Sequence, residues 1–375
     1  MNHASMESNP YFNYLFFALF FIIAISFSIL INFLILRFSK NLGMRDVTST
    51  SNLVRWGSTT KPSLGGFSFY MIFLISVSVL GVTGAEASGG FNKQLIGLMA
   101  ASSLGFLIGL ADDAYNTNPL VKFIGQLTCA TLLVLTDFII PVTPIGELNA
   151  IFTIVWIIGL MNSINMLDNM DAITSSVSIS VLLGGMVLIL LNGAFESLYL
   201  IIILGAIGAL VGFLFFNWHP SKMYMGDTGS QFLGVLLAAV SILFFWNFRN
   251  PAAGFIEIRQ FLIPMLLFII PLIDTTTVVI RRLMRRQSPF VGGKDHITHH
   301  LAYLGLPDQW VAIVLGTVSL FSIYLTVLIY QNFPSWKPIY DAYAIGYFIG
   351  MFILFQVLYN LGQSRHRARQ KALGK

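Results

Sequence analysis

The sequence predicts an all-α protein that crosses a membrane many times. Of its 375 residues, 56% are hydrophobic and only 10% are charged, whereas soluble domains carry about 25% charged residues. The mean hydropathy is +0.79, and the chain contains many long apolar runs. A bilayer core requires about 20 apolar residues per helix. We therefore expect a polytopic membrane protein in which residues 1–375 form a single integral membrane domain.

Eleven apolar runs predict about eleven transmembrane helices. One of them is short, which predicts that its helix continues into the polar residues that follow. The first ten residues lack the basic segment of a cleaved signal peptide, so the first helix is expected to remain in the protein. The runs lie at approximately 13–36, 66–82, 94–111, 120–140, 149–161 (the short one), 175–192, 198–216, 231–248, 259–280, 309–331 and 339–361.

The basic residues predict the orientation. With the N-terminus outside, 17 of the 21 Lys and Arg residues fall on the inner side, and those left outside are Lys93, Arg249, Arg259 and Lys337. Basic residues concentrate on the cytoplasmic side of membrane proteins, so we expect the N-terminus outside and residues 362–375 as a basic cytoplasmic tail. The net charge of +5 is then explained by anionic lipid, and no nucleic-acid partner is implied. The single Cys129 lies within a predicted helix, where a thiol is usually inert.

Every dense polar motif falls in a predicted inner loop. The motifs are "KPSLGG" at 61–66, "LADDAYN" at 110–116, "MNSINMLDNMDAI" at 161–173, "FNWHPSKMYMGDTGS" at 216–230 and "GGKDHITHHL" at 292–301. The predicted outer loops contain few acidic residues and no comparable cluster. We therefore expect the functional site to be formed by the cytoplasmic loops.

Asp112 and Asp113 end the third apolar run. Adjacent carboxylates repel each other, and the C-terminus of a helix is an unfavourable place for negative charge. A solvated helix end is the simplest interpretation. A nearby divalent metal or basic side chain would explain the pair better.

Four polar residues recur every three positions after the fifth run, at Asn162, Asn165, Asp168 and Asp171; we call them the ladder. Each step of three rotates a helical side chain by roughly 60°, so the four converge only if the helix ends near 165–168. Asparagine at a helix end can be a simple cap. Two carboxylates in a loop without a basic residue favour ligand binding instead.

Asp227 lies between glycines in "MGDTGS", ahead of a new apolar run. As local structure this motif is typical of a helix cap. As chemistry, a carboxylate among exposed backbone amides suits Mg²⁺ and phosphate. The acidic residues of the neighbouring inner loops favour the second interpretation.

The fifth inner loop is strongly basic and contains His296, His299 and His300. The arginines before it are explained by the positive-inside rule. His296 and His300 have a spacing that could bind zinc, but no Cys or Glu of a zinc site accompanies them. Imidazoles beside Lys294 suit hydrogen bonds to a phosphate or a sugar better.

Together, these motifs resemble those of the polyprenyl-phosphate N-acetylhexosamine-1-phosphate transferases. That family includes the phospho-MurNAc-pentapeptide transferase and the enzymes that begin O-antigen, teichoic acid and related glycans. The motifs occur in the family's order from 61 to 300, with "VKFIGQ" supplying Lys122 and Gln126. The "His-x-x-His-His" loop and eleven helices resemble the glycan-initiating branch rather than the ten-helix muramyl-pentapeptide branch.

The resemblance implies a role for each matching residue. It implies catalytic roles for Asp112, Asp113 and Asp168. It also implies a metal held by Asp227 with Asp112 and Asp168. Substrate binding falls to Lys61, Lys122, Asn162, Asn165, Asp171, Asn217, His296, His299 and His300.

The implied reaction transfers an N-acetylhexosamine 1-phosphate, most simply GlcNAc 1-phosphate, from a UDP-sugar to undecaprenyl phosphate and releases UMP. It would use Mg²⁺, with Mn²⁺ as an alternative, in the bacterial cytoplasmic membrane, and would start cell-envelope glycans such as lipopolysaccharide O-antigen or teichoic acid. The implied partners are the UDP-N-acetylhexosamine, the polyprenyl phosphate and the membrane itself, with homodimer formation left open.

Two departures and three competing interpretations accompany this resemblance. Asn169 and Ala172 replace glycines of the family motif, which removes positions that easily adopt positive φ. The loss could leave a non-catalytic scaffold. A transporter with carboxylates at the membrane edge is a second alternative, although transporter sites usually lie near the bilayer midplane. A phospho-MurNAc-pentapeptide transferase is the third.

Overall fold

The described part of the chain contains helices and no strands, which confirms the predicted all-α class. Of the basic residues counted for the orientation, Lys40, Arg45, Arg55 and Lys375 of the inner set and Arg249 of the outer set lie outside the described residues. The computed structural model describes residues 10–38, 61–83, 92–193, 198–248, 257–288, 293–332, 335 and 337–373.

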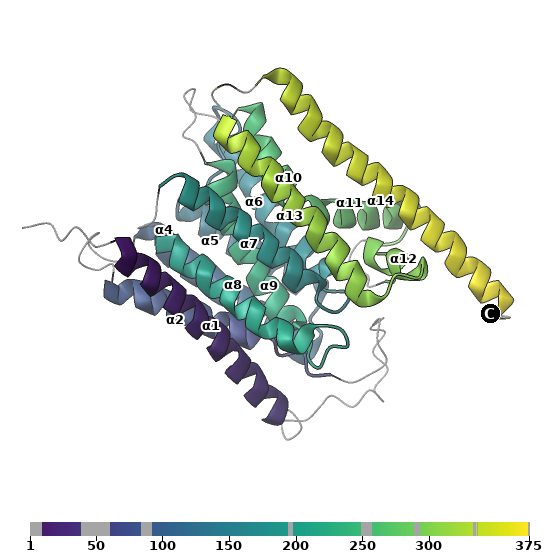
Figure 1. Ribbon diagram of the computed structural model, residues 1–375, viewed down its shortest axis with the longest axis horizontal. Coiled ribbons are helices and arrows are strands. Elements are labelled where there is room, and N and C mark those ends of the chain that lie inside the picture. Colours follow the sequence, from purple (N-terminus) through teal and green to yellow (C-terminus); the bar gives the residue numbers. More distant parts are fainter. Residues whose placement is uncertain are drawn as a thin grey trace, which may run out of the picture.

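The helices form one bundle, with α1 and α2 along one edge and α13 and α14 along the other (Figure 1). Their bounds are α1 Pro10–Phe38, α2 Gly66–Thr83, α4 Lys93–Tyr115, α5 Pro119–Leu135, α6 Gly146–Leu167, α7 Ile173–Leu191, α8 Leu198–Asn217, α9 Gly226–Ser241 with the π-helical turn η1 Ile242–Trp246, the 3-10 turn η2 Ile258–Phe261, α10 Leu262–Leu267, α11 Ile269–Met284, α12 Ile297–Tyr303, α13 Asp308–Asn332 and α14 Pro338–Ala372.

Each of the eleven predicted apolar runs falls on a helix or a helix pair. Among the described residues, 8 helices are long and apolar enough to cross a membrane, and α2 and α5 are shorter apolar helices. The remaining run forms the pair α10–α11. The chain is therefore a polytopic membrane protein, and the side on which each end lies stays a prediction.

Helix α9 is the centre of the bundle. In the 18-residue apolar stretch of each helix, 89% of the residues are buried in α9, compared with 22% in α1 and 17% in α14. Close approach to α9 depends on glycines in its neighbours: a Cβ atom at Gly66 or Gly109 would collide with the backbone of α9 at Gly229 or Asp227. Small residues allow such backbone contacts between membrane helices. As a result, α2 and α4 pack directly against the first turn of α9.

The run at 259–280 was expected to form one helix, and this prediction is wrong. The structure ends α10 at Leu267 and begins α11 at Ile269, with Phe268 between them at φ −98° and ψ 24°. Pro271 lacks the N–H that would bond to the carbonyl of Leu267, and its ring crowds that carbonyl. Proline therefore breaks this span near its middle.

Two helix ends differ from the apolar runs. Helix α5 ends at Leu135, earlier than the run at 120–140 suggested, and Asp137 follows at φ 69°. Helix α14 continues to Ala372, so most of the predicted basic tail is helical. Its Gln, Arg, Lys and Ala residues are good helix formers. Figure 1 shows this C-terminal end of α14 extending past α12.

The polar motifs meet at one end of the bundle. Helix α6 continues to Leu167, as its short apolar run predicted, and has Asp168 as its C-cap. The first and fourth inner loops are joined by backbone hydrogen bonds from Tyr224 N to Pro62 O at 2.9 Å and from Gly66 N to Met225 O at 3.1 Å. Loops far apart in the sequence therefore build a single polar surface, the polar end.

Candidate active site

The centre of the polar end is a cluster around the ammonium group of Lys122, which we call the Lys122 cluster. Lys122 Nζ lies 2.8 Å from Asp112 Oδ2, 3.3 Å from Asp227 Oδ1 and 3.2 Å from Asn165 Oδ1. Asn165 Nδ2 also donates to Asp227 Oδ1. The side chains of Asp112 and Lys122 are 11% and 17% exposed, and that of Asp227 is 31% exposed. The cluster thus unites predicted residues from four motifs.

Further amide side chains are hydrogen-bonded next to the Lys122 cluster, and Gln126 and Gln231 among them are buried. Gln126 exchanges hydrogen bonds with Asn162, and its Nε2 also donates to Gln231 Oε1 at 3.0 Å. Asn165 Nδ2 donates to Ser230 Oγ at 2.9 Å. The structure therefore places Asn162 in the support of the cluster, and its predicted contact with substrate stays a prediction.

Asp113 caps the N-terminus of helix α9. Its carboxylate accepts hydrogen bonds from Asp227 N at 3.1 Å, Thr228 N at 2.8 Å and Thr228 Oγ1 at 2.6 Å. Helix N-termini have unpaired N–H groups that favour such an acceptor. Asp113 thereby fixes the position of the neighbouring Asp227. This geometry explains one of the two adjacent acids by structure, and a catalytic role for Asp113 stays a prediction.

The ladder converges because its helix ends inside it. Asp168 has φ −76° and ψ 53°, outside the helical region, directly after α6. Loss of solvent around its carboxyl group, together with the nearby charges of Asp227 and Asp113, raises the pKa of Asp168 to about 7. Such a group exchanges a proton readily near neutral pH. Asp168 is therefore a candidate proton acceptor beside the Lys122 cluster.

Asp171 and Asn217 fasten the loops to one another. Asp171 accepts hydrogen bonds from Ser221 Oγ at 2.7 Å and Ser221 N at 3.0 Å, and it lies 3.0 Å from His219 Nδ1. Asn217 Oδ1 accepts from Ala172 N at 3.0 Å, and Asn217 Nδ2 donates to Met223 O at 3.1 Å. Both residues hold the third loop against the fourth, and their predicted nucleotide contacts stay predictions.

Lys61 contacts the fourth loop as well, from the first loop. Its Nζ donates to Ser221 Oγ at 3.0 Å and lies 5.1 Å from the centre of the Tyr224 ring. Lys61 thus places one positive charge beside the fourth loop, close to Asp171 but outside the Lys122 cluster.

The three histidines of the fifth loop are buried in and beside the short helix α12. His296, His299 and His300 are 5%, 2% and 4% exposed. Burial, together with neighbouring positive charge, lowers the pKa of His299 to about 3 and that of His300 to about 4, so both rings are neutral at pH 7. Their predicted contacts with sugar and phosphate stay predictions.

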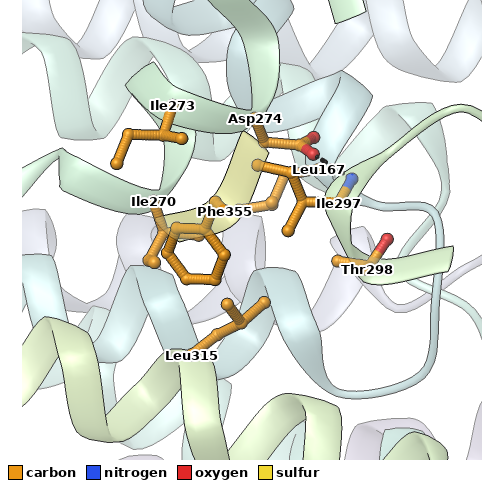
Figure 2. Close-up of a pocket in the computed structure, with 8 residues that line it drawn as sticks. All are labelled: Leu167, Ile270, Ile273, Asp274, Ile297, Thr298, Leu315 and Phe355. Carbon is orange, nitrogen blue, oxygen red and sulfur yellow. Dashed lines mark hydrogen bonds between the residues drawn. The ribbon is translucent and has the colours of Figure 1, made fainter. Parts of the chain in front are cut away.

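Asp274 is a buried acid of α11 that anchors α12. Its Oδ2 lies 2.8 Å from His296 Nδ1, and its Oδ1 accepts from Ile297 N at 2.8 Å. Figure 2 shows the carboxylate among apolar side chains that include Leu167, Ile270 and Phe355, at a cavity of about 10 Å³. That volume is close to what a single water requires, so this cavity is no substrate site.

Metal binding at the polar end can be tested against the donor set. Among the described residues, no three His, Cys, Asp or Glu side chains are grouped so that they could hold a metal ion, so a joint site of Asp112, Asp168 and Asp227 stays a prediction. Mg²⁺ in phosphate-transfer sites commonly uses one or two carboxylates together with phosphate oxygens and water. Asp112 and Asp227, which share the cation Lys122, fit that requirement.

Several residues that build this end were missed by the sequence reasoning. They are Thr117, His219, Ser221, Gln231 and Asp274. Asp274 had a usable signal, because an acid inside an apolar run is rare and usually functional. Gln231 lies in such a run as well. The others are ordinary loop residues, and only the tertiary contacts reveal them.

The fold and this end together define the class: a multi-pass membrane protein whose carboxylates, amides and one lysine meet at a single membrane edge. Comparison with known proteins gives a family match over part of the chain. Residues 95–245 match the sequence model of glycosyl transferase family 4. The resemblance inferred from the motifs is therefore confirmed; Lys61 and the histidines lie outside the matched residues.

Individual relatives are consistent with this match. The chain is 32% identical over 240 residues to a probable undecaprenyl-phosphate N-acetylglucosaminyl 1-phosphate transferase of Bacillus subtilis, covering 59% of this chain and 62% of the relative. It is 27% identical over 229 residues to a decaprenyl-phosphate N-acetylglucosaminephosphotransferase of Mycobacterium tuberculosis, covering 56% and 57%. A phospho-N-acetylmuramoyl-pentapeptide-transferase of Listeria welshimeri is 29% identical over 236 residues, covering 59% and 68%.

The chain thus spans about three-fifths of the length of the first two relatives. The many apolar helices and the bacterial relatives confirm the predicted location, a multi-pass protein of the bacterial cytoplasmic membrane.

Proposed function

We propose that this protein transfers an N-acetylhexosamine 1-phosphate, GlcNAc 1-phosphate in the first instance, from a UDP-sugar to a polyprenyl phosphate and releases UMP. The observation that carries the proposal is the Lys122 cluster at the membrane edge. Its charges suit a pyrophosphate and a metal, and its depth suits a lipid whose phosphate stays at the interface. The names of the relatives from Bacillus and Mycobacterium support the transferred group and the polyprenyl-phosphate acceptor.

The chain's own residues would act mainly by positioning and by neutralising charge, which is how phosphoryl transfer is usually catalysed. Lys122 would contact the phosphate oxygens. Asn165 would orient Asp227, and the capped N-terminus of α9 would keep Asp227 in place. When bound by Asp227 and Asp112, Mg²⁺, or Mn²⁺ in its place, would supply charge neutralisation of the pyrophosphate.

The bond changes of the proposed reaction are simple. An oxygen of the lipid phosphate forms a bond to the phosphorus that carries the sugar, and the bond from that phosphorus to UMP breaks. Asp168, with a pKa raised to about 7, would accept any proton that the lipid phosphate still carries. Asp171 and Asn217 would shape the nucleotide side by holding the third and fourth loops together. Histidine helix α12 would form the wall next to the sugar.

A groove on the membrane-facing side supports the lipid half of the proposal. It has a volume of about 240 Å³ and is lined by Leu104, Leu107, Ile108, Ala111, Thr117, Val121 and Lys122. Leu107 and Val121 are 55% and 59% exposed. The two polar residues of this lining, Thr117 and Lys122, both contact Asp112. An amphiphile with an apolar chain and a phosphate head matches this change of lining.

Release of UMP tests the proposal. Purified protein in detergent would be given Mg²⁺, undecaprenyl phosphate and one UDP-sugar at a time, with UDP-GlcNAc, UDP-GalNAc and UDP-MurNAc-pentapeptide as the panel. We expect UMP release with UDP-GlcNAc, and none when the lipid phosphate is omitted. Release with UDP-MurNAc-pentapeptide alone would favour the activity named for the Listeria relative. A folded protein that releases UMP from no UDP-sugar would contradict the transferase proposal.

A further inference from the structure

We propose that Asn169 is a positioning residue that ties histidine helix α12 to the ladder, and that together with Asp274 it sets where the histidines lie relative to the Lys122 cluster. The proposal deepens the proposed function and depends on it for the catalytic consequence. The link itself is a structural statement that can be tested without any activity.

The contacts of Asn169 join two segments that are 129 residues apart. Thr298 Oγ1 donates a hydrogen bond to Asn169 Oδ1 at 2.6 Å. Asn169 Nδ2 donates to Met166 O at 2.9 Å, which holds its side chain against the end of α6. The Asn169 side chain thus joins the C-terminal end of α6 to Thr298 of α12.

Asp274 provides the second anchor, at the start of the same helix. It binds His296 Nδ1 and the N–H of Ile297, and both the acid and the histidine are buried at 2% and 5% exposure. Apolar side chains surround the carboxylate (Figure 2). In such surroundings an unpaired carboxylate would be costly, so α12 is held firmly at this end.

Helix α12 needs these anchors because it is short. It has 7 residues, and isolated helices of that length are unstable in water. Its far end is covered by α14, where Arg365 donates to Leu304 O and Tyr359 packs on His300 with ring centres 3.6 Å apart. The bond from Thr298 to Asn169 is the contact of α12 next to Asp168 of the ladder. It therefore determines the distance between the histidines and Asp168. Glycine at this position would provide no such contact.

The test uses the variants Asn169→Gly and Thr298→Val, which remove the link from opposite sides. Hydrogen–deuterium exchange would be measured for the amides of 297–303 in the full-length protein in detergent. We expect exchange to rise about tenfold in each variant, the change that corresponds to one buried hydrogen bond of about 1.4 kcal/mol. The double variant should exchange no faster than either single variant, because both remove the same bond.

Matched variants separate the link from a general loss of stability. Thr298→Ser keeps the hydroxyl and should restore slow exchange. Thr317→Val makes the same change at an exposed threonine of α13 whose hydroxyl bonds to Ile313 O, and should leave α12 unchanged. Unchanged exchange of 297–303 in both Asn169→Gly and Thr298→Val, or fully additive effects in the double variant, would overturn the proposal.

Kinetics then test the consequence for the site. We expect Asn169→Gly and Thr298→Val to raise KM for the UDP-sugar about tenfold, with KM for the lipid phosphate unchanged. An equal rise in both KM values would contradict the positioning role. If the wild-type protein releases no UMP, the proposed function fails, whereas the exchange measurement still decides whether the link exists.

Discussion

The Lys122 cluster and histidine helix α12 lie at the same end of the molecule but are built in different ways. The cluster uses residues at the ends of α4, α5, α6 and α9, apolar helices of 16 to 23 residues that pack along much of their length. Helix α12 has 7 residues and is held by side chains of other segments. The comparison teaches that the packing of long helices positions the charged groups of the cluster, while individual hydrogen bonds position α12 beside them.

The largest effect on activity is expected from a substitution that disrupts the Lys122 cluster. Asp227→Asn keeps the shape of the side chain and removes the charge that faces Lys122. We expect kcat/KM for UMP release to fall by about 10²–10³-fold, the usual loss for one preorganised electrostatic contact, with the thermal unfolding temperature nearly unchanged. Ile151→Val, at a lipid-facing position that is 58% exposed, is the control and should retain full activity. Full activity in Asp227→Asn would remove Asp227 from the site.

The second prediction concerns α12 and pH. The pKa of His299 is lowered to about 3 and that of His300 to about 4, whereas unfolded histidine titrates near 6.5. The unfolded state therefore binds protons first as the pH falls below 6.5, and stability that is complete above that pH is lost between about 6.5 and 3. From pH 7 to pH 5 we expect each ring to cost the folded state up to roughly 2 kcal/mol.

Thermal unfolding at pH 7 and pH 5 would measure this loss. His299→Gln cannot be protonated and should show a smaller difference between the two pH values than the wild type. An equal pH dependence in the variant would show that the acid loss comes from elsewhere, and would weaken the contrast between α12 and the cluster.

A third prediction separates the two adjacent acids of α4. Asp113→Asn removes the charged cap of α9, so we expect the free energy of unfolding to fall by about 1–2 kcal/mol. Activity should fall less than in Asp227→Asn, because Asp113 acts on the site through other residues, by holding Asp227 in position and by its charge near Asp168. An activity loss as large as that of Asp227→Asn, with an unchanged unfolding temperature, would support the direct catalytic role predicted from the sequence.

The smallest effect is expected at Ala172, which has φ 65° and ψ −8°. Left-handed backbone costs a residue with a Cβ atom roughly 1–2 kcal/mol, and glycine avoids this cost. Loss of one buried methyl group offsets part of the gain, so Ala172→Gly should stabilise the protein by roughly 1 kcal/mol. Ser176→Gly, later in α7, should destabilise it. A lower unfolding temperature in Ala172→Gly would show that the methyl group packs better than the backbone conformation costs.

The two departures from the family motif therefore have different meanings. At Ala172 the structure retains the positive φ that the replaced glycine would have served, so the fold tolerates the alanine. Asn169 does not have positive φ, and its side chain makes contacts that glycine cannot make. The sequence showed that both residues were unusual, but only their backbone conformations and partners distinguish strain from a new contact.

The sequence by itself determined the membrane class, the number of apolar runs and the convergence of the polar motifs at one end. The physical reason is that bilayer thickness sets the length of each helix, so residues that end successive helices are brought to the same membrane edge. The end of α6 within the ladder followed from side-chain geometry, because only a helix that ends there lets the four residues converge.

Only the tertiary structure decided which charged groups pair. It made Asp113 a cap, gave Lys122 its partners, recruited Asp274 to His296 and placed α12 against Asn169. Such contacts join segments up to 129 residues apart and leave no periodic pattern in either segment. They depend on the packing of α2 and α4 against α9, and close packing is a property of surfaces that a linear sequence does not display.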